Sequence, residues 1–211
     1  MSNIQQDPGS FRDPLSRVFV GADTVVRAFT EQGKADIDAV WSKKSIARAL
    51  ASGDLIESNI VEPASVGLGA PWAGAMTHPK VPFISYPYEW TFSMLKDAAL
   101  LQLQLTRETL ADGIGLKDAT PYNIQFIGSR PQFIDAGSFE KRKKSDPWYG
   151  YRQFCEMFLY PLMLQSYLGV GFQPFLRGAV NGIAPDVMRK LLPRSEEHTS
   201  ELQSRETISY A

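Results

Sequence analysis

The chain has 211 residues, of which 44% are hydrophobic and 21% are charged, and its formal net charge is −1. This composition is typical of a globular protein with a core, and it favours neither nucleic acid nor a membrane surface as a partner. Cys155, the single cysteine, lies in an apolar run and is expected to be a buried thiol. The first residues are polar and no run reaches membrane-spanning length, so we expect a cytoplasmic protein.

The end of the chain differs in origin from the rest. Residues 194–204, RSEEHTSELQS, resemble the translation of a sequencing-library adapter, and residues 205–211 continue it in frame. We interpret 194–211 as a non-native tail and leave it out of the fold prediction. Without its two arginines and four glutamates, residues 1–193 carry 20 Lys and Arg against 19 Asp and Glu, a net charge of +1. We expect the natural sequence to continue beyond Pro193.

Strand and helix patterns alternate near the N-terminus. The β-branched stretches 17–20 and 24–27 predict a hairpin. Apolar residues at helical spacing predict one or two helices over 36–52, ended by Gly53.

A glycine-rich stretch and a proline-broken stretch follow. Residues 66–74 lack a dinucleotide-binding glycine spacing, because Pro71 stands where the phosphate-binding helix should begin, and are expected to be a linking loop. Residues 80–90, KVPFISYPYEW, predict an edge strand that leads into a hinge. His78 has no second histidine nearby and is expected in a surface loop.

The C-terminal part is mostly helical. Residues 91–112 predict the longest helix, with an apolar stripe and a stop at Gly113. Residues 148–168 predict a second helix, bent at Pro161, and 185–192 continue the helical pattern. Together with the strands, these elements predict an α+β fold.

Three polar side chains surround a predicted hairpin. Asn123 follows Asp118 by five residues, and Asp135 comes twelve residues later, at the end of a second apolar run. The alternating residues 123–126 and 132–134 predict strands that join them. This is the order of groups in a phosphoryl-transfer site, where one Asp orients the attacking hydroxyl and an Asn and a second Asp bind magnesium. The alternative is that the three residues cap turns and bind no metal.

Longer segments strengthen the interpretation as a phosphoryl-transfer site. YPYEWTFSMLKDAALLQLQLTRETLADGIGLKDATPYNIQF, FIDAGSFE and GYRQFCEMFLYPLML resemble the kinase-like N-terminal region of bacterial class I SAM-dependent methyltransferases, including nodulation-type ones. The resemblance implies a protein-kinase-like fold. It implies a reduced N-lobe of strands over 1–85 and a mostly helical C-lobe over 86–193. The methyltransferase domain, which would bind SAM, would follow this region and is missing from the chain.

The resemblance also implies roles for individual residues. Asp118 would be catalytic, Asn123 and Asp135 would bind Mg²⁺, and ATP would lie against an aromatic wall. That wall would consist of Tyr86, Tyr88 and Trp90. A small-molecule substrate and the attached methyltransferase domain would be the partners.

Departures from the kinase pattern leave the activity open. Leu116-Lys117-Asp118 lacks the usual histidine, Ala136 replaces the usual aromatic residue, and no glycine-rich phosphate loop or strand lysine is visible. Arg27 is the only basic residue in a comparable strand position, with a solvent-facing role as its alternative. Three functions therefore stand: a nucleotide- or substrate-binding module, an active small-molecule phosphotransferase, and an inactive truncated fragment.

Overall fold

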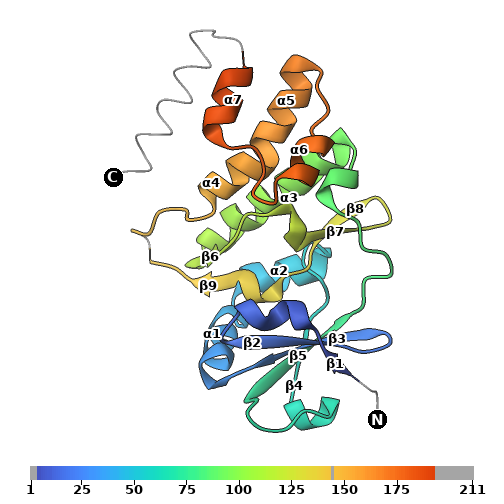
Figure 1. Ribbon diagram of the computed structural model, residues 1–211. Coiled ribbons are helices and arrows are strands. Elements are labelled where there is room, and N and C mark those ends of the chain that lie inside the picture. The colour runs from blue at the N-terminus through green and yellow to red at the C-terminus, as the bar shows by residue number, and fades with distance from the viewer. Residues whose placement is uncertain (1–3, 144, 193–211) are drawn as a thin grey trace. The chain divides into compact units, whose positions relative to one another are not determined.

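A computed structural model describes residues 4–143 and 145–192, which group into two compact units (Figure 1). The sheet unit comprises residues 4–84, 101–117 and the described part of 123–148. The helical unit comprises residues 85–100, 118–122 and 149–192. The adapter-like residues 194–211 lie outside the described residues. The first boundary between the units lies between residues 84 and 85, and the predicted lobes meet between residues 85 and 86. However, 101–117 and most of the predicted hairpin region group with the N-terminal sheet.

Five antiparallel strands form the main sheet of the sheet unit. Their order is β1-β2-β3-β5-β4, with β1 at Gln5–Gln6, β2 at Ser16–Val20, β3 at Thr24–Phe29, β4 at Asn59–Val61 and β5 at Gly74–Pro79. The predicted N-terminal hairpin is confirmed, with Val18 opposite Arg27. Because β3 also pairs with β5, where Arg27 lies opposite Met76, Arg27 belongs to the central strand.

The strand predicted at Lys80–Trp90 is wrong. The strand is β5, which ends at Pro79, and the following residues form a loop and the short 3-10 helix η3 (Pro87–Glu89). Pro82 and Pro87 have no backbone N–H to give to a sheet, which accounts for the end of pairing there. The signal for β5 was hidden because its first residue, Gly74, belongs to the glycine-rich stretch that predicts a loop.

Two helices follow β3, which confirms one of the two alternatives predicted for residues 36–52. They are α1 (Glu31–Trp41) and α2 (Lys44–Ser52). Helix α1 begins five residues earlier than predicted, because the Thr30 hydroxyl accepts a hydrogen bond from the Gly33 N–H and caps the helix. Helix α2 ends at Gly53, whose φ of 76° suits glycine. A core cluster joins α1 to the sheet: Phe29, Ile37, Met76 and Ala136, with Trp41 packed beside it.

Two small antiparallel pairs complete the sheet unit. The predicted hairpin is confirmed as β7 (Ile124–Ile127) and β8 (Arg130–Phe133), joined by a turn with Gly128 at φ 63°. The sequence did not predict β6 (Ile114–Leu116) and β9 (Phe139–Lys141), which pair with each other. Both are only three residues long, too short for a visible alternation. The short 3-10 helices of this unit are η1 (Pro8–Arg12), η2 (Pro63–Val66) and η5 (Ala136–Ser138).

The helical unit is built around a long helical run. Helix α4 (Tyr151–Phe154) continues through the π-helix η6 (Cys155–Leu159) into α5 (Tyr160–Leu168), where the sequence predicted one helix. Cys155 is a buried thiol that forms no disulfide, as predicted. Helix α6 (Gln173–Gly178) packs against η3, and α7 (Pro185–Leu191) packs against α5 (Figure 1).

The longest helix, α3 (Phe92–Leu110), confirms the helix predicted over 91–112 and contributes residues to both units. Its apolar content falls short of a bilayer span, and within 4–143 and 145–192 no helix has both the length and the apolar character to cross one.

Candidate functional site

The β7–β8 hairpin brings Asn123 and Asp135 to one end of a single element. Asn123 ends the 3-10 helix η4 (Pro121–Asn123) directly before β7, and Asp135 follows β8 by two residues. The Ile134 N–H donates a hydrogen bond to the Asn123 carbonyl over 2.8 Å, which extends the ladder beyond the Ile124–Phe133 pair. The two predicted metal ligands are therefore backbone neighbours at the open end of the hairpin.

The hairpin is anchored to the segment that follows α2. The Phe133 N–H donates to the Asp54 carbonyl over 2.8 Å, and the Ile56 N–H donates to the Phe133 carbonyl over 2.9 Å. Gln132 Nε2 donates to the Gly53 carbonyl over 2.9 Å. The ring of Phe133 is buried and meets that of Phe139 edge-on, with centroids 5.5 Å apart. These contacts hold the base of the candidate site on packed elements rather than on a free loop.

Asp135 is paired with Arg27 of the central strand β3. Arg27 Nη2 lies 2.7 Å from Asp135 Oδ1, and the two side chains are only 17% and 26% exposed. The same carboxylate oxygen caps η5 by accepting a hydrogen bond from the Gly137 N–H at 3.2 Å. The structure thus decides between the two alternatives for Arg27: it is a half-buried ion-pair partner rather than a solvent-facing strand residue.

A second cation lies beside this ion pair. Lys117 Nζ donates to the Gly137 carbonyl over 3.2 Å, and its side chain is otherwise exposed. Gly137 itself permits the close approach, since a Cβ there would lie 2.8 Å from Arg27 Nη1. Burial disfavours the charged form of Asp13 nearby. Hydrogen bonds from Ser16 Oγ and the Leu15 N–H, with the charges of Lys117 and Arg27, nevertheless hold its pKa below the ordinary value.

The end of the hairpin carries two side chains of the types that bind magnesium. A carboxylate and a side-chain amide oxygen are the hard ligands that Mg²⁺ prefers. Among the described residues, Asn123 Nδ2 is buried and makes no hydrogen bond. Within the described residues no group of three or more His, Cys, Asp or Glu could hold a metal. A magnesium site that is completed by phosphate oxygens and water needs only one or two carboxylates.

Asp118 belongs to the helical unit, whereas Asn123 and Asp135 belong to the sheet unit. The Asp118 side chain is exposed. The next residue, Ala119, is buried, and its N–H donates to Gln153 Oε1 over 2.8 Å. Gln153, which sequence reasoning missed, therefore fixes the loop that carries Asp118 to helix α4.

The three aromatic residues of the predicted nucleotide wall have different surroundings. The rings of Tyr86 and Tyr88 stack with centroids 5.4 Å apart and an interplanar angle of 4°, and Tyr86 is exposed. Trp90 is only 1% exposed, and its Nε1 donates to Ser85 Oγ over 2.9 Å. Trp90 is thus a core residue, and the tyrosine pair keeps ring surface at the edge of the helical unit. Burial, with a contribution from Tyr88, raises the pKa of Tyr122 beside this pair.

His78 is not the surface-loop residue that its Thr-His-Pro context predicts. It lies on β5 and is only 6% exposed. Its Nδ1 is 3.0 Å from Ser58 Oγ and 3.3 Å from the Glu57 carbonyl, and the carbonyl contact requires the proton on Nδ1. Burial, helped by the charge of Arg27, lowers the pKa of His78 to about 4. His78 is therefore a neutral core residue, and the prediction failed because β5 was not foreseen.

Comparison with known proteins shows a similarity to a nodulation protein. No protein-family model matches the chain. The chain is 40% identical over 185 residues to nodulation protein NoeA of Rhizobium meliloti (strain 1021), and the matched region covers 87% of this chain. That region spans only 38% of the relative's length. The similarity therefore concerns one part of a longer protein.

Proposed function

We propose that this chain is a kinase-like module that binds a magnesium-bound nucleotide at the end of the β7–β8 hairpin. The observation that carries the proposal is the pairing of Arg27 with Asp135, next to Asn123. A basic residue on a central N-terminal strand and an Asp just after a hairpin are the two parts of a kinase site that handle phosphate and metal. Arg27 would take the place of the strand lysine that the sequence lacks.

Each side chain has a distinct task in this proposal. Asp135 and Asn123 supply oxygen ligands, and Arg27 and Lys117 supply positive charge to phosphate oxygens. A bound Mg²⁺ would neutralise charge on the phosphates. Asp118 would orient the hydroxyl of a small-molecule substrate, a role that rests on its place in the sequence five residues before Asn123.

Binding rather than turnover is favoured by the surroundings of Asp135. Its Oδ1 already accepts hydrogen bonds from Arg27 and Gly137, which leaves Oδ2 for a metal. The loop before Asp118 also lacks the histidine of active kinases. A phosphotransferase activity on a small molecule is the second candidate, and it is favoured by the retention of Asp118 itself.

The similarity to nodulation protein NoeA supports a nodulation-related role for the longer protein to which the chain would belong. We further propose that a SAM-dependent methyltransferase domain is attached to this module in that protein. The module would present a substrate, or respond to a nucleotide, on behalf of that domain.

Thermal shift with Mg-ATP tests nucleotide binding. Ligand that binds the folded state raises Tm by mass action, so we expect saturating Mg-ATP to raise the Tm of the wild-type chain. Asp135→Ala is expected to lose this increment, whatever its own Tm. Asp38→Ala is the matched control, because it removes a carboxylate from an ion pair on the exposed face of α1. The absence of a nucleotide-dependent increment in the wild type would exclude the proposal.

A further inference from the structure

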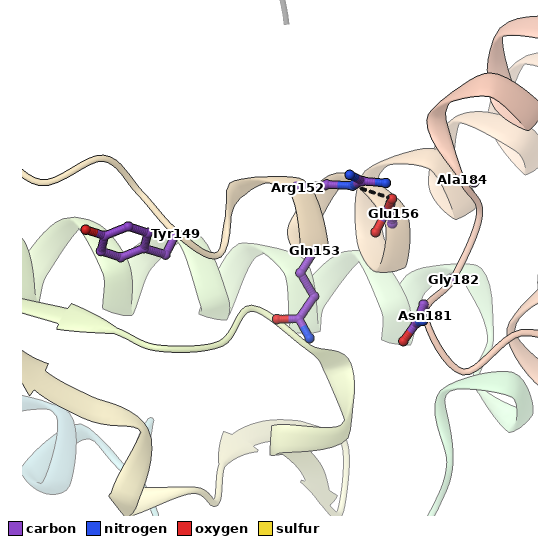
Figure 2. A pocket seen from close by; sticks show the side chains of 7 residues that line it. All are labelled: Tyr149, Arg152, Gln153, Glu156, Asn181, Gly182 and Ala184. Atoms are coloured by element: carbon purple, nitrogen blue, oxygen red, sulfur yellow. Dashed lines mark hydrogen bonds and ion pairs between the residues drawn. The ribbon is translucent and has the colours of Figure 1, made fainter. Parts of the chain in front are cut away.

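The helical unit contains a polar cavity whose lining includes none of the residues proposed to bind nucleotide. Its volume is about 520 Å³, within the range of roughly 300–1,000 Å³ that small-molecule sites occupy. Figure 2 shows its lining: Arg152, Gln153 and Glu156 come from the helical run α4–η6, and Asn181 comes from the loop between α6 and α7. Tyr149 lies on the segment before α4.

The walls of this cavity are fixed by backbone contacts. The Ile183 N–H donates to the Glu156 carbonyl over 2.8 Å, which ties the 179–184 loop to the π-helix η6. Gly182 makes the approach possible, since its φ is 81° and a Cβ there would overlap the Glu156 carbonyl. A π turn inserted in a helix is frequently found at functional sites. The 179–184 loop and η6 are thus held together where they line the cavity.

The lining is rich in hydrogen-bonding groups but carries no net charge. Arg152 Nε lies 2.9 Å from Glu156 Oε1, so the two ionised groups neutralise each other. The Glu156 side chain is only 13% exposed, which leaves its second oxygen as an acceptor in a poorly solvated place. The amides of Gln153 and Asn181 each offer donors, and Asn181 also offers a carbonyl oxygen. Tyr149 adds an exposed aromatic face at the rim.

We propose that this cavity binds a neutral, hydroxyl-rich small molecule of the monosaccharide or cyclitol class. Hydroxyl groups both donate and accept, and they match a lining that mixes carboxylate, amide and guanidinium groups. The aromatic face of Tyr149 suits the C–H face of such a ring. An apolar ligand would leave the polar lining unsatisfied, and an anion would face the paired carboxylate of Glu156.

The cavity adjoins the loop of Asp118. Gln153 lines the cavity and, through Oε1, holds the N–H of Ala119, the residue after Asp118. The ligand in the cavity would thus be the hydroxyl compound that Asp118 orients, and this last link rests on the proposed function.

Direct titration without nucleotide or magnesium tests the proposal. The full chain is titrated with D-glucose and with myo-inositol, and binding is measured by calorimetry and saturation-transfer NMR. L-glutamine and inorganic phosphate serve as zwitterionic and anionic comparisons. We expect saturable binding of at least one of the two hydroxyl-rich compounds. Asn181→Ala and Glu156→Gln are each expected to weaken it by about five- to tenfold.

Asn59→Ala, an exposed asparagine of β4, is the matched control and should leave the affinity unchanged. The proposal is overturned by the absence of saturable binding of both compounds, by equal affinities in wild type and both cavity variants, or by preferential binding of glutamine or phosphate. Every titration omits nucleotide, and both cavity variants change residues of the helical unit. A failure of the magnesium-nucleotide proposal would therefore leave this result untouched.

Discussion

Removing the Asp135 carboxylate should lower the stability of the fold, because this carboxylate forms a half-buried ion pair with Arg27. Asp135→Ala leaves the Arg27 guanidinium without the oxygen that lies 2.7 Å from Nη2, and it also removes the acceptor of the Gly137 N–H. A hydrogen bond to a charged group contributes about 1.5–3 kcal/mol. Solvent screening at 17% and 26% exposure places the expected loss near the lower end, about 1.5–2 kcal/mol. For a chain of this size that corresponds to a fall in Tm of about 3–8 °C.

Thermal unfolding of Arg27→Ala, Asp135→Ala and the double variant measures the coupling between the two side chains. We expect the double variant to lose less than the two single variants together, with a coupling of at least about 1 kcal/mol. Asp38→Ala should lower Tm less, because the Lys34–Asp38 pair is solvent-exposed and contributes little net stability. A fall in Tm for Asp135→Ala no larger than that of Asp38→Ala, or additive single effects, would refute the reasoning.

Three further predictions concern single positions. The pKa of His78 is about 4 in the fold against about 6.5 in an unfolded chain. The lowered pKa of His78 therefore contributes its full stabilisation above pH 6.5, and this stabilisation is lost as the pH falls towards 4. In urea titrations, the free energy of unfolding of the wild type should fall by about 2 kcal/mol between pH 7 and pH 5 because of His78. His78→Gln should lack this part of the fall. Gly182→Ala should lower the free energy of unfolding by about 3 kcal/mol or more in thermal unfolding, because φ is 81° and a Cβ would overlap backbone atoms. Gly178→Ala is the control and should be near neutral, because a Cβ there has nothing within 4 Å. Equal effects of the two substitutions would contradict this prediction. Gln153→Ala should cost about 1–3 kcal/mol by leaving a buried N–H unpaired, and Gln153→Glu, which keeps an acceptor oxygen, should recover most of it.

The sequence predicted the elements that have strong local signals. The β2–β3 and β7–β8 hairpins and helix α3 have clear alternation or helical spacing and glycines where the chain turns. The same local pattern placed Asn123 and Asp135 at one end of a hairpin. These features follow from period, turn chemistry and helix stops, which are properties of neighbouring residues.

Features that depend on distant residues were not predictable in the same way. The pairing of Arg27 with Asp135 joins residues that are 108 positions apart. Strand β5 is buried between β3 and β4, and pairing on both sides overrides the weak strand propensity of its glycine and histidine. The prediction of a surface loop at His78 failed for the same reason, because His78 lies on β5. The polar cavity depends on a π turn and on a close approach by Gly182, neither of which has a periodic signal.

The most direct test of the central claim is calorimetric titration of the full chain with Mg-ATP and with ATP in the presence of EDTA. We predict saturable binding that requires magnesium, is at least about tenfold weaker in Asp135→Asn and is unchanged in Asp38→Asn. Absence of binding by the wild type, or an affinity that is the same in wild type and Asp135→Asn, would contradict the assignment of a magnesium-nucleotide site to the end of the β7–β8 hairpin.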